Sequence, residues 1–496
     1  MTREMKPENF TALYLENKYV KLCVLPQIGG RLFYAIDKTN NYDIFYHQDV
    51  IKPANVGMTG AWISGGVEWN VFHHHRATSH APCNYKIESN TDGSMTIWLG
   101  ETEWRHRMSW AIGITLHPDK SYIEISGRLS NQTENVNTML YWSNVSTAAN
   151  ENYQIIFPPT TEFGTFHCKS SFCHWPITKE PYNGIEEYAN GVDASWWKNN
   201  PYGVSIFVHD LKDDFIAGYD HGKDAGTMLV GNHNIVKGGK FWSWGYNSGW
   251  PTKILTENAG HYIELMTGAY SDNQPDYSWL YPYEVKKFSQ YWYGIRNIGG
   301  AKKASKVAAI NLDVQKDGKV RVAANATEYL PQARVLLLKN GETIFDKSVD
   351  ISPEKPFSEY AAISGEFKDT DLTMKLIRND GKELLSYTPI KNDASKPLPE
   401  IVAPPLPPSE IKNIEECLLV GMRNYQFFNP FIKPEDYFEE VLRRDSGNVR
   451  ANIMMGTIWR KRGDNQKAEK YFRTAYERRE KIIPIPKTVR RFIISA

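Results

Sequence analysis

The chain reads Tyr122-Ile123-Glu124-Ile125-Ser126-Gly127-Arg128-Leu129, a stretch in which apolar and polar side chains alternate. A period of two residues is typical of a half-buried β-strand. The same alternation recurs along residues 20–25 and 96–99, and the segment 117–120, His-Pro-Asp-Lys, predicts a hairpin turn between two long strands. Between residues 19 and 297 no stretch of comparable length has an apolar period of 3.6 residues. We therefore expect this part of the chain to form a large antiparallel β-sandwich.

Three pairs of residues that favour two-residue hairpin turns lie between apolar runs further along the chain. They are Asp317-Gly318, Asn340-Gly341 and Asp380-Gly381. Short strands joined by such turns predict a small immunoglobulin-like sandwich. The proline-rich segment that follows predicts a semi-rigid spacer, because proline holds the backbone extended. We expect four parts, which are the large sandwich over 1–300, the small sandwich over 303–392, a linker over 393–409 and a helical segment over 410–496.

The segment after the linker contains a pattern of small and large residues at helical spacing. The pattern consists of Gly456, Trp459, Ala468, Phe472 and Ala475. It matches a tetratricopeptide repeat, in which small residues let two antiparallel helices approach and aromatic residues fill the gap. Because such repeats need about three copies for a continuous core, we expect these helices to pack on the preceding part, to oligomerise, or to belong to an array cut short at residue 496. They are also expected to bind a protein partner.

The composition argues against two classes of partner. Lysine and arginine total 58 residues against 57 for aspartate and glutamate, and no long basic run is interleaved with aromatic residues, so we expect no nucleic acid. No run of about 18 apolar residues occurs, and the first residues lack the apolar core of a signal peptide, so we expect a soluble protein of the cytoplasm or periplasm without membrane contact. Aromatic residues make up 13% of the chain. Their flat rings suit the apolar faces of pyranose sugars, although a large β core also uses them.

The densest group of polar and aromatic side chains lies between residues 65 and 80. The chain reads Gly65-Gly66-Val67-Glu68-Trp69-Asn70-Val71-Phe72-His73-His74-His75-Arg76 and continues to Ser79 and His80. Two consecutive glycines permit a close backbone approach, and titratable groups beside aromatic rings are what a small polar ligand requires. This segment therefore predicts the floor of a binding or active site. The alternative is a buried loop whose histidines only satisfy backbone groups.

Two further parts of the chain, residues 22–32 and 260–292, contain recognisable motifs. Residues 22–32 read Leu-Cys-Val-Leu-Pro-Gln-Ile-Gly-Gly-Arg-Leu, which is similar to the opening of galactose mutarotase-like proteins. The stronger match is Gly260-His261-Tyr262-Ile263-Glu264-Leu265, then Trp279-Leu280-Tyr281-Pro282-Tyr283-Glu284, then Phe288-Ser289-Gln290-Tyr291-Trp292, which resembles the end of the aldose 1-epimerases. Over about 15–297 the chain looks like an uncharacterised bacterial family of this superfamily that carries tetratricopeptide repeats behind the β-region. The resemblance implies a mainly β, galactose mutarotase-like supersandwich for residues 1–300.

One catalytic residue carries over from the resemblance. Glu264 matches the general base of the epimerases, which removes the proton of the anomeric hydroxyl. The epimerase histidine would be expected near residues 140–144, where this chain has none, so the mutarotase reaction does not follow from the resemblance. A proton donor to the ring oxygen remains open among His74, His75 and His233.

Hydrolysis of a glycosidic bond needs one protonated and one ionised carboxyl group on either side of the anomeric carbon. We expect Glu68 and Glu264 to form this pair. Trp69 and Phe72 would desolvate Glu68, raise its pKa and suit it to proton donation, whereas Glu264 beside a histidine or lysine would stay ionised as base or nucleophile. The two carboxyl groups are predicted to face one open cleft, roughly 5 to 10 Å apart. The alternative is that each glutamate is only a strand residue paired with a base.

Neutral imidazoles at close spacing can bind zinc, but successive residues of an extended segment point to opposite faces, so His73 and His75 can share a ligand that His74 cannot join. We expect no metal and no cofactor. The sequence predicts a carbohydrate-active enzyme, a glycoside hydrolase acting on a pyranoside, with an aldose 1-epimerase-like isomerase and a non-catalytic sugar-binding scaffold as alternatives. The residues expected to bind the sugar are Trp69, Asn70, His73, His74, His75, Arg76, Trp142, Asn144, His233, Trp242 and Trp244.

Overall fold

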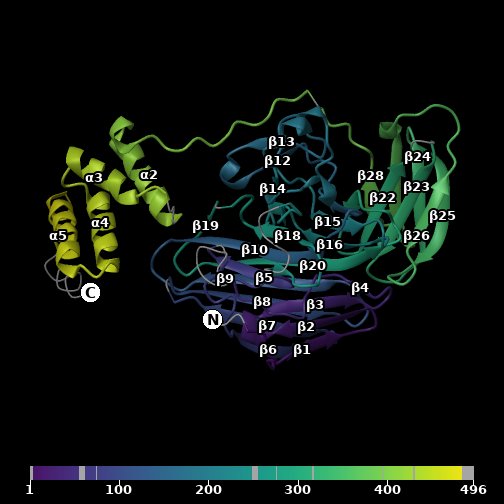
Figure 1. Cartoon of the computed structure of the whole chain (residues 1–496), viewed down its shortest axis with the longest axis horizontal. Coiled ribbons are helices and arrows are strands. Elements are labelled where there is room, and N and C mark those ends of the chain that lie inside the picture. Colours follow the sequence, from purple (N-terminus) through teal and green to yellow (C-terminus); the bar gives the residue numbers. More distant parts are fainter. Residues whose placement is uncertain are drawn as a thin grey trace. The chain divides into compact units, whose positions relative to one another are not determined.

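The computed structural model describes residues 4–54, 62–73, 75–104, 106–247, 255–274, 276–315, 318–393, 395–427 and 431–482. The chain divides into two compact units, Met1–Ile401 and Val402–Ala496 (Figure 1). The first unit is built from strands and the second from helices, so the predicted mainly β fold with a helical C-terminal segment is confirmed. None of the described helices is long and apolar enough to cross a membrane.

The first sheet of the large sandwich has twelve strands, nearly all of them in one antiparallel row. In spatial order the row contains β1 (Leu13–Glu16), β2 (Val20–Leu25), β3 (Arg31–Asp37), β5 (Val67–Phe72), β10 (Asn137–Ala148), β18 (Tyr262–Ala269), β17 (Gly238–Ser243), β14 (Val204–Val208), β12 (Phe163–Thr165) and β13 (Phe172–His174). Two short strands lie off this row, β4 (Tyr42–Asp43) beside β3 and β19 (Ser278–Leu280) beside β10.

The second sheet has eight strands and packs against the first. In spatial order they are β11 (Tyr153–Ile156), β15 (Phe215–Asp220), β16 (Ala225–Gly231), β20 (Val285–Arg296), β9 (Ile123–Asn131), β8 (Met108–Leu116), β7 (Met95–Thr102) and β6 (Asn84–Ser89). The core between the sheets takes alternate residues of each strand, and Ile123, Ile125 and Leu129 of β9 are fully buried there. The predicted hairpin at 117–120 is confirmed, because β8 and β9 pair antiparallel across it.

The small sandwich consists of two four-stranded sheets. One contains β21 (Lys303–Ala304), β22 (Ala308–Val314), β23 (Val320–Ala326) and β26 (Phe357–Ala361), and the other contains β25 (Glu342–Ile351), β24 (Leu330–Lys339), β27 (Leu372–Ile377) and β28 (Glu383–Tyr387). Asn340-Gly341 and Asp380-Gly381 join paired strands as predicted, and β22 pairs with β23 around the third pair, of which Asp317 lies outside the described residues.

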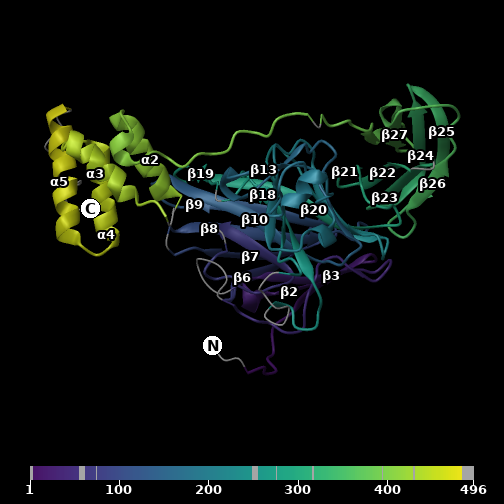
Figure 2. The same cartoon turned by 45° about the horizontal axis from the view of Figure 1, so that its top comes forward.

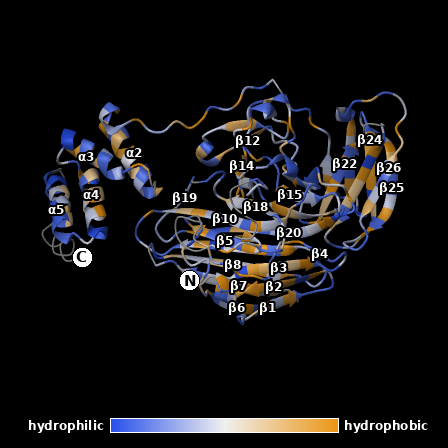
Figure 3. Ribbon diagram, viewed as in Figure 1, coloured by the Kyte–Doolittle hydropathy of each residue, from blue (hydrophilic) through white to orange (hydrophobic). Residues whose placement is uncertain are grey.

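The small sandwich packs on the second sheet of the large one, at the right of Figures 1 and 2. A shared apolar cluster joins them, with Tyr219 and Tyr293 from the large sandwich and Ala309 and Ala323 from the small one. Figure 3 shows apolar residues concentrated on the strands of both sandwiches. The two sandwiches therefore belong to one packed body, which agrees with their place in a single unit.

Within its described residues, 402–427 and 431–482, the second unit contains the helices α2 (Ile414–Gln426), α3 (Pro434–Arg444), α4 (Val449–Lys461) and α5 (Asn465–Ile482). Successive helices approach closely where glycine removes a side chain. A Cβ at Gly456 of α4 would lie 2.6 Å from the ring of Phe472 of α5, and one at Gly421 of α2 would lie 2.8 Å from the ring of Phe438 of α3. Short 3-10 helices span Pro26–Ile28, His167–Lys169, Glu186–Asn190, Trp197–Asn199, Asp369–Asp371 and Pro408–Glu410.

Candidate functional site on the outer face of the first sheet

The side chains of strand β5 alternate between the two faces of the first sheet. Val67 and Trp69 point into the core between the sheets, so Glu68 and Asn70 point to the opposite, outer face of the first sheet. The preceding Gly65 and Gly66 both have positive φ, and a Cβ at Gly66 would lie 2.6 Å from the carbonyl oxygen of Leu32. Glycine is therefore required where the chain enters β5 beside β3.

The register of four neighbouring strands brings the two predicted glutamates onto this outer face. Glu68 of β5 lies opposite Asn144 of β10, and Ser146, two residues further along β10, lies opposite Glu264 of β18. Residues directly opposite each other in a sheet share a face. Because neighbouring strands lie about 4.8 Å apart, β5 and β18 flank β10 at a backbone separation of about 10 Å. On the far side of β18, Glu264 faces Trp242 of β17.

Both carboxyl groups are buried among polar groups. Glu68 is 3% exposed and Glu264 is 6% exposed. His75 brings its Nδ1 to 2.8 Å from Oε2 of Glu68. The side-chain amide of Asn144 donates a hydrogen bond to Glu264. The outer face thus carries a compact set of ionisable groups from strands far apart in the sequence.

The pKa of Glu68 is lower than its ordinary value. Burial by itself would raise this pKa, but the charges of His75, Arg31 and Arg76 outweigh the burial. Burial likewise disfavours the charged form of His75, and its pKa is nevertheless raised because Glu68 stabilises the imidazolium. Glu68 and His75 therefore each stabilise the charged form of the other.

The pKa of Glu264 is raised above its ordinary value, chiefly by burial, with His75 and Lys240 opposing the shift. Burial also lowers the pKa of Lys240 to about 8, against the attraction of Glu264. These directions correct the sequence-based expectation that Glu68 has the raised pKa, because the pKa of Glu68 is lowered and that of Glu264 is raised. The reason is tertiary, because the imidazole pairs with Glu68 and the ammonium of Lys240 donates to Gln274 at 2.9 Å.

Several buried polar atoms on this face have no hydrogen-bond partner among the described residues. Buried polar groups are normally paired, so a group of exceptions calls for an explanation such as a missing ligand. The atoms are Oε1 of Glu68, Oδ1 of Asn70, Oδ1 of Asn144, Nε1 of Trp142, and Nε and Nη2 of Arg31.

Sequence reasoning missed two charged residues of the site. Arg31 is 3% exposed, begins β3 and donates from Nη1 to the carbonyl oxygen of Gly65 at 2.5 Å. Lys240 is 4% exposed and lies on β17 opposite Met266 of β18. Met266 is two residues after Glu264 on β18, so Lys240 and Glu264 share a face of the sheet. For Lys240 the available signal was a single charged residue within an otherwise uncharged strand, whereas β3 carries Asp37 as well as Arg31. Their proximity to Glu68 and Glu264 depends on strand order, which the sequence does not show.

Three predicted sugar-binding residues around β5 point elsewhere. Trp69 is a correction, because its fully buried ring stacks on Trp292 in the core, with ring centroids 6.0 Å apart. Arg76 is buried with its guanidinium over the ring of Trp110, 4.5 Å from the centroid. His73 brings Nε2 to 3.2 Å from the carbonyl oxygen of Thr138.

His73 and His75, which by alternation could share a ligand, have different contacts. His73 contacts Thr138, whereas His75 folds back onto Glu68, which lies opposite Asn144. These two positions on β10 are six residues apart, or about 20 Å along the strand. His74 lies outside the described residues. Within the described residues no group of three or more His, Cys, Asp or Glu side chains could hold a metal ion.

The remaining predicted binding residues differ in exposure. Trp142 is fully buried on the outer face, where a Cβ at Gly268 would lie 2.6 Å from its ring. Trp242 and Trp244 are partly exposed and meet edge to face, with ring centroids 4.0 Å apart. His233 pairs with Asp214 in the loop before β15, with 2.7 Å between Nδ1 and Oδ1, outside the set of groups around Glu68 and Glu264.

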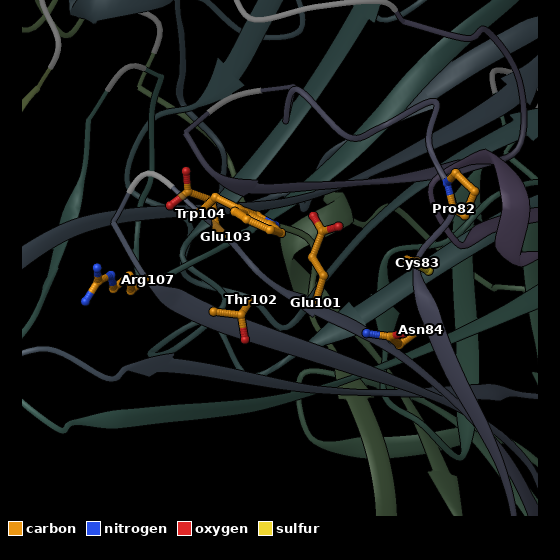
Figure 4. A pocket seen from close by; sticks show the side chains of 8 residues that line it. All are labelled: Pro82, Cys83, Asn84, Glu101, Thr102, Glu103, Trp104 and Arg107. Atoms are coloured by element: carbon orange, nitrogen blue, oxygen red, sulfur yellow. The ribbon is translucent and has the colours of Figure 1, made fainter.

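A separate open depression of about 630 Å³ lies at the end of β7 (Figure 4). None of the predicted site residues lines it. The lining residues are Pro82, Cys83, Asn84, Glu101, Thr102, Glu103, Trp104 and Arg107.

Comparison with solved structures shows similarity over most of the chain. A TPR-domain containing protein from Parabacteroides distasonis is 15% identical, with 96% of this chain and 73% of that chain covered and a TM-score of 0.53. A galactose mutarotase-like protein from Clostridium acetobutylicum is 9% identical over 58% of this chain and 96% of that chain, with a TM-score of 0.40. A putative aldose 1-epimerase from Klebsiella pneumoniae is 9% identical over 56% of this chain and 77% of that chain, with a TM-score of 0.40. At these identities the likeness concerns the fold alone.

Two family models match the chain. Residues 303–387 match the second domain of YphG-like proteins. Residues 1–295 match a domain of unknown function, DUF5107. Because this second match covers more than half of the 496 residues, the chain belongs to the DUF5107 family.

Proposed function

We propose that the outer face of the first sheet is the active site of a glycoside hydrolase that acts on a pyranoside. The observation that carries the proposal is the pair of buried carboxyl groups, Glu68 and Glu264, whose pKa values are moved in opposite directions on one face. Such a pair separates the roles of acid and base. Glu264 keeps its proton more strongly and is the general acid, while Glu68 is ionised and is the base or nucleophile.

In this reaction the bond between the anomeric carbon and the leaving oxygen breaks. Glu264 donates its proton to the leaving oxygen, and the carboxylate of Glu68 either takes a proton from the attacking water or attacks the anomeric carbon itself. The imidazolium of His75 holds Glu68 ionised. These roles reverse the assignment that we expected from the sequence.

The surroundings of the two carboxyl groups support a sugar as the ligand. One side-chain oxygen each of Glu68, Asn70 and Asn144 is an acceptor without a partner among the described residues, and sugar hydroxyls are donors that suit such acceptors. Trp242 and Trp244, partly exposed on the same side as Glu264, add aromatic surface. We extend the proposal to the organisation of the chain, with the large sandwich over 1–300, the small sandwich over 303–392 and the linker over 393–409. In this proposal residues 410–496 form a tetratricopeptide-type scaffold that binds a protein partner.

A second candidate is an aldose 1-epimerase-like isomerase. It is favoured by His75, because the raised pKa of this imidazole reflects attraction to both Glu68 and Glu264. A charged imidazole can protonate a ring oxygen while a carboxylate takes the proton of the anomeric hydroxyl. In that reaction no bond to a second sugar breaks.

Glu264→Gln and Glu68→Gln test the proposed roles. Glycosides with a basic leaving group need the general acid, whereas aryl glycosides that release an acidic phenol do not. We expect E264Q to lose about 10²–10⁴-fold in rate on the first class and to retain much of its rate on the second. E68Q is expected to lose turnover on both. Release of reducing sugar and of phenol measures the two classes.

His233→Gln is the matched control, because this histidine pairs with Asp214 outside the site. Its rates should equal those of the wild type. The opposite pattern, with E68Q rescued by acidic leaving groups, would restore the roles expected from the sequence. Anomer exchange by NMR without hydrolysis would favour the isomerase, and sugar binding without either reaction would favour a binding module.

A further inference from the structure

Strand β6 forms an edge of the second sheet (Figure 1). It pairs with β7 on one side, without a bulge, and it contains no proline. Tyr85 and Ile87 are 49% and 50% exposed, although they lie opposite the buried core residues Leu99 and Ile97. Edge strands are usually protected by proline, bulges or a covering segment, so this edge is a candidate for pairing with another strand.

The backbone of β6 leaves a row of hydrogen-bonding groups on its free side. The N–H of Asn90 donates to the carbonyl oxygen of Ser94, so the even-numbered residues of β6 direct their backbone N–H and C=O groups toward β7. In an antiparallel ladder these groups alternate, so those of the odd-numbered residues point away from β7. The same alternation holds at Cys83, whose N–H points away from β7 and donates to the carbonyl oxygen of Pro26 outside the sheet. The residues whose outward backbone groups have no partner among the described residues are Tyr85, Ile87 and Ser89.

We propose that a second copy of the chain pairs with this edge, antiparallel about a twofold axis at Ile87, so that two second sheets become one continuous sheet. Side-chain charge selects this register. An axis at Lys86 would place Lys86 opposite its own copy, and an axis at Glu88 would do the same with two carboxylates. An axis at Ile87 instead places Lys86 opposite Glu88 of the second copy, and symmetry repeats this pair.

The same register suits the distances of an antiparallel pair. Ile87 and its copy form a hydrogen-bonded pair, so Lys86 and Glu88 of the second copy occupy a non-hydrogen-bonded pair, where facing Cα atoms approach to about 4.5 Å. Opposite charges at such positions stabilise pairing and like charges oppose it. Within one copy Lys86 Nζ lies 3.3 Å from Glu88 Oε1, with side chains 71% and 40% exposed. A surface ion pair of this kind contributes little to stability, so replacing it with a pair to the second copy costs little.

Two charge-reversal variants test the register, with the full chain studied by sedimentation over a wide range of concentration. Lys86→Glu places two carboxylates opposite each other at both sites, and Glu88→Lys places two ammonium groups there. Each variant alone should dimerise about tenfold more weakly than the wild type, because two favourable pairs become unfavourable. Mixing the two variants restores opposite charges at both sites and should restore dimers.

Lys347→Glu is the matched control, because Lys347 is an exposed lysine of another edge strand, β25, with its own ion pair to Glu359. This variant should dimerise as the wild type does. A wild type that stays monomeric at every concentration would overturn the proposal. A dimer that neither reversal weakens, or a mixture that associates no better than its components, would equally overturn the β6 pairing.

Discussion

The two faces of strand β5 are both buried, and they differ in whether their polar atoms are satisfied. On the inner face, Trp69 stacks on Trp292 and donates its Nε1–H to the carbonyl oxygen of Gly30 at 2.8 Å. On the outer face, Glu68 and Asn70 are as deeply buried, yet each has an oxygen without a partner among the described residues. On this strand burial alone therefore does not separate the two faces, whereas unpaired polar atoms do.

The largest effect is expected on the inner face. Trp69→Ala removes a fully buried ring from the core and should lower the free energy of unfolding by about 3–5 kcal/mol. Denaturant unfolding monitored by circular dichroism measures this loss. A loss below about 1 kcal/mol would contradict the assignment of this face to the core.

Lys240→Met on the outer face should change the dependence of stability on pH. The native pKa of Lys240 is about 8, against an ordinary value of 10.5 in the unfolded chain. As pH rises from 8 to 10.5 the native protein loses a proton that the unfolded chain keeps, so this group contributes a rise in stability, roughly 3 kcal/mol in all. The variant should lack this rise in stability, which urea unfolding at pH 7 and at pH 10 measures. Equal pH slopes for variant and wild type would contradict the shifted pKa.

His75→Gln should cost about 1–2 kcal/mol of stability near neutral pH by removing the bond to Glu68. The stability that comes from the raised pKa of His75 is lost as the pH rises through the pKa of His75. The stability that comes from the lowered pKa of Glu68 is lost as the pH falls through the pKa of Glu68. The cost should therefore be greatest between the two pKa values.

The same variant should move the acidic limb of the rate profile to higher pH, because burial then raises the pKa of Glu68 without opposition from the imidazolium. Rates measured across pH test this shift. An unchanged acidic limb would mean that Glu68 is not the ionised group that the reaction needs.

The smallest effect is expected for His233→Gln. His233 is 33% exposed and pairs only with Asp214 among the contacts described for its ring, so stability should change by less than about 0.5 kcal/mol. Thermal unfolding of the variant and the wild type measures the difference. A large change would contradict the description of His233 as a partly exposed residue held by one pair.

The sequence predicted those features that depend on neighbouring residues. The alternation at 122–129 became β9, the turn at 117–120 joins β8 to β9, and two of the Gly-containing pairs join strands of the small sandwich. Glu68 was singled out by its local setting and Glu264 by its resemblance to a catalytic glutamate, and both lie on one face. Arg31 and Lys240 were missed because nothing near them in the sequence reveals which strands lie beside β5 and β18.

The sequence by itself determined the mainly β fold and its hairpins, because strand period and turn preference are local properties of the chain. The tertiary structure alone decided that Trp69 belongs to the core, that His75 pairs with Glu68, and that Glu264 rather than Glu68 has the raised pKa. The physical reason is that a pKa is set by burial and by charges within a few ångströms, and these charges come from strands that are distant in the chain.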